Sequence, residues 1–208
     1  MKRIITKLAL FVFFTIVFSS FTGCKGTSQQ ANANNAAAAP PNAVAQSNGE
    51  PTKSSNYPLL VSGIADANIE LLDSTMTKVA ERKGKVILLN LWGIWCGPCR
   101  AEMPALAQLQ AQYGEKGFEV IGLNIGDSDG SPEGLENIKK FSEQMNLNYT
   151  LGRIDRAATN QFYLLTRQEV VPQSVLVTRD GHLRGVFVGG GSRVTDSIKE
   201  TVEKAMNE

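Results

Sequence analysis

Two mostly apolar runs dominate the hydrophobic pattern of this 208-residue chain. Residues 86–92 and 118–125 are apolar at most positions, which is typical of strands buried in the middle of a parallel sheet. Each run precedes a segment with apolar residues at helical spacing, 99–113 after the first and 132–145 after the second. This alternation of strand and helix predicts an α/β sheet with helices on both faces.

Shorter elements are predicted before and after these two units. A strand pair is expected ahead of the first buried strand. A hairpin followed by a helix is expected at the end, because Arg179-Asp180-Gly181-His182 separates two apolar runs and is typical of a hairpin turn. In chain order, these additional strands are expected at residues 59–64, 68–72, 148–154, 174–178 and 183–188, and the additional helices at 157–163 and 193–206.

A C-x-x-C motif, Cys96 to Cys99, lies where the first buried strand gives way to its helix. This position is typical of a redox-active dithiol in a strand–helix–strand unit. The N-terminus of the helix supplies partial positive charge and free N–H groups, which favour a thiolate over a thiol. The two-residue spacer keeps the second sulfur close enough to attack a disulfide formed at the first. The motif therefore predicts a thiol–disulfide oxidoreductase site.

Three other uses of the motif fit the rest of the chain less well. A closed zinc site needs four ligands, and only Cys24 and His182 remain as further cysteine and histidine. A purely structural disulfide would close a very short loop and stabilise the fold little. A Cys–His protease would need His182 near a cysteine, but that histidine is expected in a turn between two strands. Neither a metal nor another cofactor is expected.

The N-terminal region predicts export. Positive charge followed by a short apolar core, residues 8–18, is typical of a bacterial signal peptide, assigned here to residues 1–23. The stretch 22–24, Thr-Gly-Cys, resembles the lipobox of bacterial lipoproteins, which implies that Cys24 is lipidated. Phenylalanine stands at the first lipobox position in place of leucine, so ordinary cleavage is the alternative. Lys25 after the cysteine favours an outer-membrane address.

The composition changes twice more along the chain. Residues 24–56 consist of the lipidated cysteine and a run rich in Ala, Asn, Gln, Ser and Pro, which predicts a disordered tether. Residues 57–208 are long enough for one domain with its own core. The chain has 21 basic and 20 acidic residues without a basic stripe, so nucleic acid is not an expected partner. A monomer is expected, anchored by lipid in the bacterial cell envelope with its domain in the periplasm or outside the plasma membrane.

The stretch from Leu88 to Pro104 resembles the thioredoxin-like TlpA/ResA family of membrane-tethered reductases. The resemblance covers essentially all of the globular domain and includes residues 170–174 ahead of a strand and an Asp-Gly hairpin. It implies a thioredoxin fold, in which helices flank a central mixed sheet, with an N-terminal strand pair and an inserted helix. The segment 128–150 is similar to that insertion.

The family resemblance also implies the roles of individual residues. Cys96 would be the nucleophile that attacks a substrate disulfide. Cys99 would be the resolving cysteine, so that the two form the redox-active disulfide. Pro172 would follow a cis peptide bond and face this pair. The residues expected to wall the active site are Trp95, Gly97, Pro98 and Pro172.

A proton acceptor for the resolving cysteine is harder to assign. Thioredoxin keeps a buried aspartate at the position that matches Asn90, so that acceptor is absent here. Asp127 stands where the ResA pattern places a glutamate near the cysteines, and its carboxylate is the expected acid–base group. The alternative is that Asp127 only caps the loop after a strand.

The expected function is reduction of disulfides in exported proteins, with the haem-attachment cysteines of apocytochrome c as one candidate client and with a thiol electron donor. The Gly97-Pro98 spacer matches thioredoxin, a reductant, and lacks the histidine typical of strong oxidants. Two alternatives remain open. One is a disulfide oxidase or isomerase, and the other is a non-catalytic chaperone that binds copper or a client through the same thiols.

Overall fold

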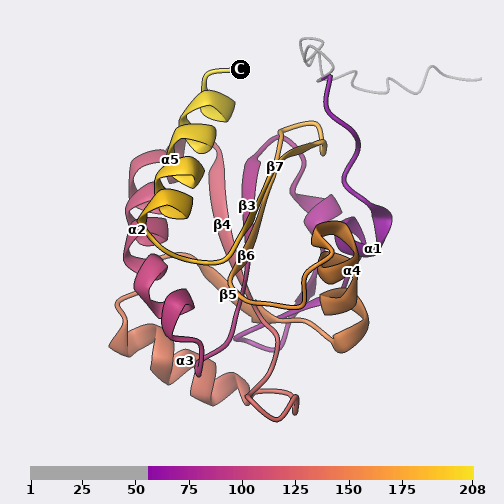
Figure 1. The fold of residues 1–208 in the computed structure, drawn as a ribbon. Helices are drawn as coiled ribbons and strands as arrows, with labels where there is room; N and C mark the ends of the chain where they lie inside the picture. The colour runs from indigo at the N-terminus through magenta and orange to yellow at the C-terminus, as the bar shows by residue number, and fades with distance from the viewer. Residues whose placement is uncertain (1–55) are drawn as a thin grey trace, which may run out of the picture. The chain divides into compact units, whose positions relative to one another are not determined.

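The computed structural model describes residues 56–208, whose strands form one mixed sheet (Figure 1). In chain order the strands are β1 (Ile69–Leu71), β2 (Met76–Thr77), β3 (Val86–Trp92), β4 (Phe118–Asn124), β5 (Thr150–Arg153), β6 (Gln173–Val177) and β7 (Leu183–Val188). Across the sheet their order is β2-β1-β5-β4-β3-β6-β7. Strands β3, β4 and β5 run parallel, and the other neighbouring pairs are antiparallel. The mixed sheet confirms the predicted α/β class.

Helices cover both faces of this sheet, as expected (Figure 1). Helices α2, α3 and α5 pack on one face, and α1 and α4 pack on the other. The bounds are α1 (Ser62–Ala65), α2 (Gly97–Tyr113), α3 (Leu135–Gln144), α4 (Arg156–Thr166) and α5 (Ser192–Met206), with 3-10 turns at Val79–Arg82 and Gly114–Lys116.

The two apolar runs at residues 86–92 and 118–125 become the buried strands β3 and β4, because both faces and both edges of each strand are covered. Every residue of these two strands is buried. Along β3, Leu88 and Trp92 face the core beneath α2, whereas Leu89 and Leu91 face the core beneath α4. Full burial of one such side chain contributes roughly 1.5–3 kcal/mol to folding. The strand that leads to the cysteines is therefore held rigidly.

The register of the sheet brings distant segments to the end of β3. Strand β6 pairs antiparallel with β3, with Leu91 opposite Gln173 and Asn90 opposite Ser174. Pro172 immediately precedes β6, so it lies beside the point at which β3 ends and the cysteine motif begins. Strand β4 ends on the other side of β3 and leads into the loop that contains Asp127.

The structure corrects the first predicted strand, residues 59–64. Only Leu59 makes a β-bridge, with His182, and residues 62–65 form α1. Leu60 and Ile64 are both buried at helical spacing, which explains why a short apolar run forms a helical turn here. The N-terminal strand pair is instead β1 with β2.

The remaining predicted elements are all present, with shifted ends. The inserted helix α3 begins at Leu135 after an N-cap at Gly134, not at Pro132. Helix α4 is longer than the predicted 157–163.

The predicted signal peptide, Cys24 and all but the last residue of the 24–56 tether lie outside the described residues. They remain predictions. Within residues 56–208, no helix has the length and apolar character needed to cross a membrane.

Candidate active site

The two cysteines of the motif lie at the start of α2, directly after β3. Cys96 is the N-cap of the helix, and it forms a disulfide with Cys99 in the first turn. Cys99 is fully buried, whereas the Cys96 residue is 4% exposed. The pair is therefore accessible to another protein from the Cys96 side.

The first turn of α2 favours negative charge at the outer sulfur. The backbone N–H of Cys99 donates to Sγ of Cys96 at 3.2 Å. Pro98 also lies in this turn, where its missing N–H leaves no helical hydrogen bond unmade. Once the disulfide is reduced, the free N–H groups and the helix dipole stabilise a thiolate at Cys96.

A proline loop packs against the disulfide. The Val171–Pro172 peptide bond is cis, as the family resemblance implied. The carbonyl oxygen of Val171 lies 3.7 Å from Sγ of Cys96. Gly190 packs against both prolines, since a Cβ added there would lie 2.9 Å from Cβ of Pro98 and 3.6 Å from Cγ of Pro172. The close packing fixes the proline loop beside the outer sulfur.

Trp95 forms an exposed apolar wall next to the cysteines. Its side chain is 47% exposed, and its indole Nε1 donates to the carbonyl of Gly126 at 3.1 Å. Gly93 leaves the space for the folded-back ring, since a Cβ there would lie 2.6 Å from Nε1. The indole is thus held in place and still presents one surface to solvent.

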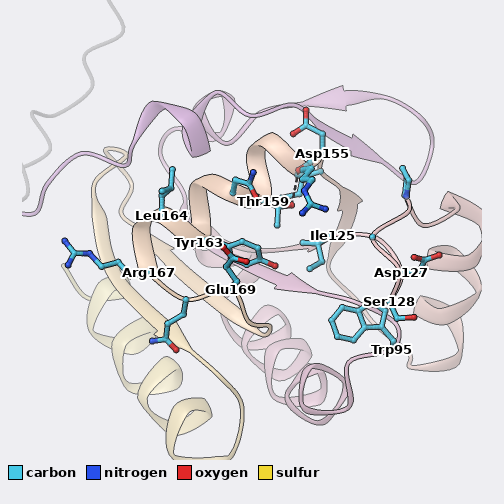
Figure 2. Close-up of a pocket in the computed structure, with 16 residues that line it drawn as sticks. Trp95, Ile125, Asp127, Ser128, Asp155, Thr159, Tyr163, Leu164, Arg167 and Glu169 are labelled. Carbon is cyan, nitrogen blue, oxygen red and sulfur yellow. Dashed lines mark hydrogen bonds between the residues drawn. The ribbon is translucent and has the colours of Figure 1, made fainter.

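A groove of about 1040 Å³ extends from Trp95 along α4 (Figure 2). The 125–132 segment and Trp95 form one side of it, and α4 forms the other. Figure 2 shows Trp95 and Asp127 at one end, Leu164 at the other, and Tyr163 between them. Leu164 is 71% exposed. An exposed apolar side chain at each end suits the groove to contact with another polypeptide.

A buried carboxyl group that was not predicted from the sequence lies on α2, one helical turn after Cys99. Glu102 is only 3% exposed, and its carboxylate accepts a hydrogen bond of 2.7 Å from the side-chain amide of Asn90. The same amide donates to Ser174 at 3.0 Å. Burial raises the pKa of Glu102 from 4.5 to about 7, although the hydrogen bond from Asn90 opposes the shift. The residue can therefore gain or lose a proton near neutral pH.

The spacing of the buried residues along α2 could have identified Glu102 from the sequence. The helix buries Cys99, Met103 and Leu106, and position 102 follows Cys99 by three residues. Residues three apart lie on the same helix face, about 5–6 Å apart at their Cβ atoms. A glutamate on the buried face of a helix next to the C-x-x-C motif is a candidate acid–base group.

Asp127 lies in a different environment from the one expected of an acid–base group. It is part of an exposed turn on the rim of the groove. One of its carboxylate oxygens accepts hydrogen bonds from the backbone N–H groups of Asp129 at 3.1 Å and Ser131 at 3.2 Å. The neighbouring Asp129 carboxyl raises the pKa of Asp127. These contacts match the loop-capping alternative, and Glu102 fits the buried acid–base position better.

His182 lies in the β6–β7 turn, at the opposite end of β6 from Pro172. Its Nδ1 is 3.0 Å from a carboxylate oxygen of Asp180. In the described part of the chain, no three His, Cys, Asp or Glu side chains gather in a way that could hold a metal ion. The geometry therefore offers thiol chemistry at the cysteine pair and supplies no histidine to it.

Reversible exchange of this disulfide with thiols of another protein needs only the two sulfurs, the helix terminus and the proline loop. The fold that positions them is that of the thioredoxin-like thiol–disulfide oxidoreductases. The Redoxin family model matches residues 62–202, and the chain belongs to this family.

Two relatives and one solved structure illustrate the match. The thiol-disulfide oxidoreductase ResA of Geobacillus thermodenitrificans (strain NG80-2) is 29% identical over 134 residues, covering 64% of this chain and 70% of that protein. ResA of Bacillus cereus (strain ATCC 10987 / NRS 248) is 32% identical over 135 residues, with the same coverages. A Chlorobium tepidum structure assigned as thiol:disulfide interchange protein DsbE has a TM-score of 0.55 at 26% identity, covering 67% of this chain and 92% of that chain. The protein is a thiol–disulfide oxidoreductase.

Proposed function

We propose that the protein works as a reductase of disulfides in exported client proteins, through the Cys96–Cys99 pair. The observation that carries the assignment of the reacting cysteine is the unequal burial of the pair, which leaves Cys96 as the one that a client can reach. The sulfur of Cys96 lies beside the proline loop, and Cys99, in the first turn of α2, is fully buried. The Gly97-Pro98 spacer, which is shared with the reductant thioredoxin, supports the reducing direction.

In this direction the reaction has two exchange steps. The thiolate of Cys96 attacks one sulfur of the client disulfide, forms a mixed disulfide, and releases the other client sulfur as a thiolate. The thiolate of Cys99 then attacks Sγ of Cys96, so that the Cys96–Cys99 bond forms and the second client sulfur leaves. Two electrons pass to the client. A thiol donor reduces the resulting disulfide for the next cycle.

Glu102 is the proposed proton acceptor for the second step. Cys99 must lose its proton before it attacks, and the carboxyl of Glu102 lies one helical turn further along the same buried face. A group whose pKa is about 7 can accept that proton at neutral pH and release it afterwards. Asn90 fixes the orientation of the carboxylate through its 2.7 Å hydrogen bond.

The proposed setting is the bacterial cell envelope. An export signal at residues 1–23, lipidation at Cys24 and a tether over residues 24–56 would place the domain on the outer side of a membrane, with an outer-membrane anchor favoured. Proteins in that compartment acquire disulfides that some pathways must remove. Apocytochrome c, whose haem-attachment cysteines must be free thiols, is the proposed client class, and the protein is proposed to act as a monomer.

The reduction potential of the cysteine pair tests the direction of the reaction. The purified protein would be equilibrated in graded thiol–disulfide buffers, and the reduced fraction measured. A potential at or below about −230 mV is expected for a reductase. A potential above about −180 mV would instead identify an oxidase or isomerase.

The groove is proposed as the surface that receives the client polypeptide. The Leu164→Asp substitution should raise KM for a disulfide-bonded polypeptide about tenfold, because it places a charge at an exposed apolar contact. KM for a small aromatic disulfide, which does not reach Leu164, should not change. Leu59→Asp is the matched control, since Leu59 is 68% exposed and lies at the β6–β7 turn. Equal effects of the two substitutions would refute the docking role of the groove.

A further inference from the structure

Three side chains beneath α2 carry buried polar atoms without a hydrogen-bond partner in the described residues. These atoms are Oη of Tyr149, Nε1 of Trp92 and Oδ1 of Asn90. Trp92 and Asn90 are fully buried, and Tyr149 is 9% exposed. Buried polar groups are rarely left unpaired in folded proteins, and an internal water molecule is the usual partner where several of them converge.

The side chains of Trp92 and Tyr149 approach each other over Gly122. A Cβ at this position would lie 3.1 Å from Nε1 of Trp92 and 3.3 Å from Cε2 of Tyr149, the ring atom next to the carbon that carries the hydroxyl. The nearest atom to it would be Cδ2 of Leu151, at 2.5 Å, so an apolar side chain closes this place on one side. Gly122 lies directly opposite Asn90 in the β3–β4 register. The Asn90 amide in turn holds Glu102. Two donors, one from Tyr149 and one from Trp92, therefore lie near the acceptors of the Asn90–Glu102 pair.

We propose that a water molecule binds at this place and links the Tyr149 hydroxyl and the Trp92 indole N–H to the Asn90–Glu102 pair. Tyr149 is then a positioning residue that acts on Glu102 through the water. This inference rests on the proposed role of Glu102 as the proton acceptor for Cys99. It adds a second hydrogen-bond donor to the ionised carboxylate.

Among the described groups around Glu102, Tyr149 is the titratable side chain that comes from another element. Its own helix supplies Cys99, β3 supplies Asn90, and β6 supplies Ser174. The core residues of α3 and α5 on this face are apolar: Ile138, Phe141, Ile198, Val202 and Ala205. Burial, and secondly the charge of Glu102, raise the pKa of Tyr149. The hydroxyl therefore stays protonated and can donate throughout the working pH range.

Part of Tyr149 also borders the surface. Together with Gln110, Glu119 and Thr150 it lines a surface hollow of about 470 Å³. The hydroxyl oxygen itself is buried, so it is screened from the solvent of the hollow and available to an internal water.

The test is a Tyr149→Phe substitution, which keeps the ring and removes the hydroxyl. The titration of Glu102 would be followed by carboxyl-carbon NMR in the oxidised full-length protein. Loss of one water-mediated hydrogen bond should move the midpoint upward by about one pH unit. Tyr113→Phe is the matched control, because Tyr113 packs against Phe118 at the far end of α2. An unchanged midpoint in Tyr149→Phe, or an equal shift in both variants, would overturn the proposal.

A second measurement guards against a variant that does not fold. In a high-resolution crystal structure of the unaltered protein, a water is expected within hydrogen-bond distance of both Oη of Tyr149 and the carboxylate of Glu102. A direct contact between these two groups, with no water, would refute the inference. Neither readout depends on turnover, so failure of the water link is distinguishable from failure of Glu102 as the proton acceptor.

Discussion

Replacing Cys96 with serine should abolish disulfide reduction, with a loss of at least about a thousandfold, because the hydroxyl of serine neither ionises near neutral pH nor exchanges with a disulfide. Replacing Cys99 should have a different outcome. The Cys99→Ser variant keeps the outer nucleophile and should stop after the first exchange, as a mixed disulfide with the client. Stopped turnover and mass spectrometry of the trapped complex are the two measurements.

The trapping result depends on the burial difference between the two sulfurs. Cys99 has no exposed surface, so the Cys96→Ser variant should trap no client even though one thiol remains. Cys24→Ser is the control, since the third cysteine is assigned to lipidation and its loss should leave the exchange rate of the detergent-solubilised protein unchanged. Client trapped through Cys99 or Cys24 in the absence of Cys96 would contradict the assignment of the nucleophile.

Most of the sheet could be predicted because its central strands depend on local pattern. Strands β3 and β4 are buried at every position, so their sequences are apolar at most positions, a pattern typical of buried strands. Residues 59–64 form a similar run, but it is short, and such runs fit a strand or one helical turn equally well. The contacts of Leu60 and Ile64 with the core beneath α4 decide between these outcomes, and they involve residues far along the chain.

The cysteine pair could also be read from the sequence because its chemistry lies within four residues. The residue that accepts the proton of Cys99 could not be predicted from such a local motif. Asp127 was identified by its place in the chain relative to a family pattern, whereas the buried position of Glu102 depends on a contact across the helix–sheet interface with Asn90. A charged residue in a helix is normally exposed, and Glu102 would be expected to follow that rule. Only the spacing of the apolar residues in α2 indicates that Glu102 lies on the buried face.

Glu102 should make the stability of the protein fall as pH rises. Its pKa in the fold is about 7, above the ordinary value of 4.5, so folding favours the protonated carboxyl. The stabilisation from this group is complete below pH 4.5 and is lost as pH rises through 7, a change of about 3 kcal/mol. Glu102→Gln stays neutral and should lose this dependence. Urea unfolding of the oxidised protein at pH 5 and pH 8 measures the difference, with the exposed Glu143→Gln as control.

The same substitution should slow the second exchange step. Glutamine can still accept the hydrogen bond from Asn90, so the geometry is kept, but it cannot take the proton of Cys99. Resolution of a preformed mixed disulfide at pH 7 should slow by about a hundredfold and recover as the pH rises, because hydroxide then removes that proton. Stopped-flow release of a fluorescent client measures both rates. If the resolution rate is unchanged while the pH dependence of stability disappears, then Glu102 is a buried acid without a part in the exchange. We expect Glu102→Gln to lose both the fast resolution step and the pH dependence of stability, because the carboxyl of Glu102 lies on the buried face of α2 beside Cys99.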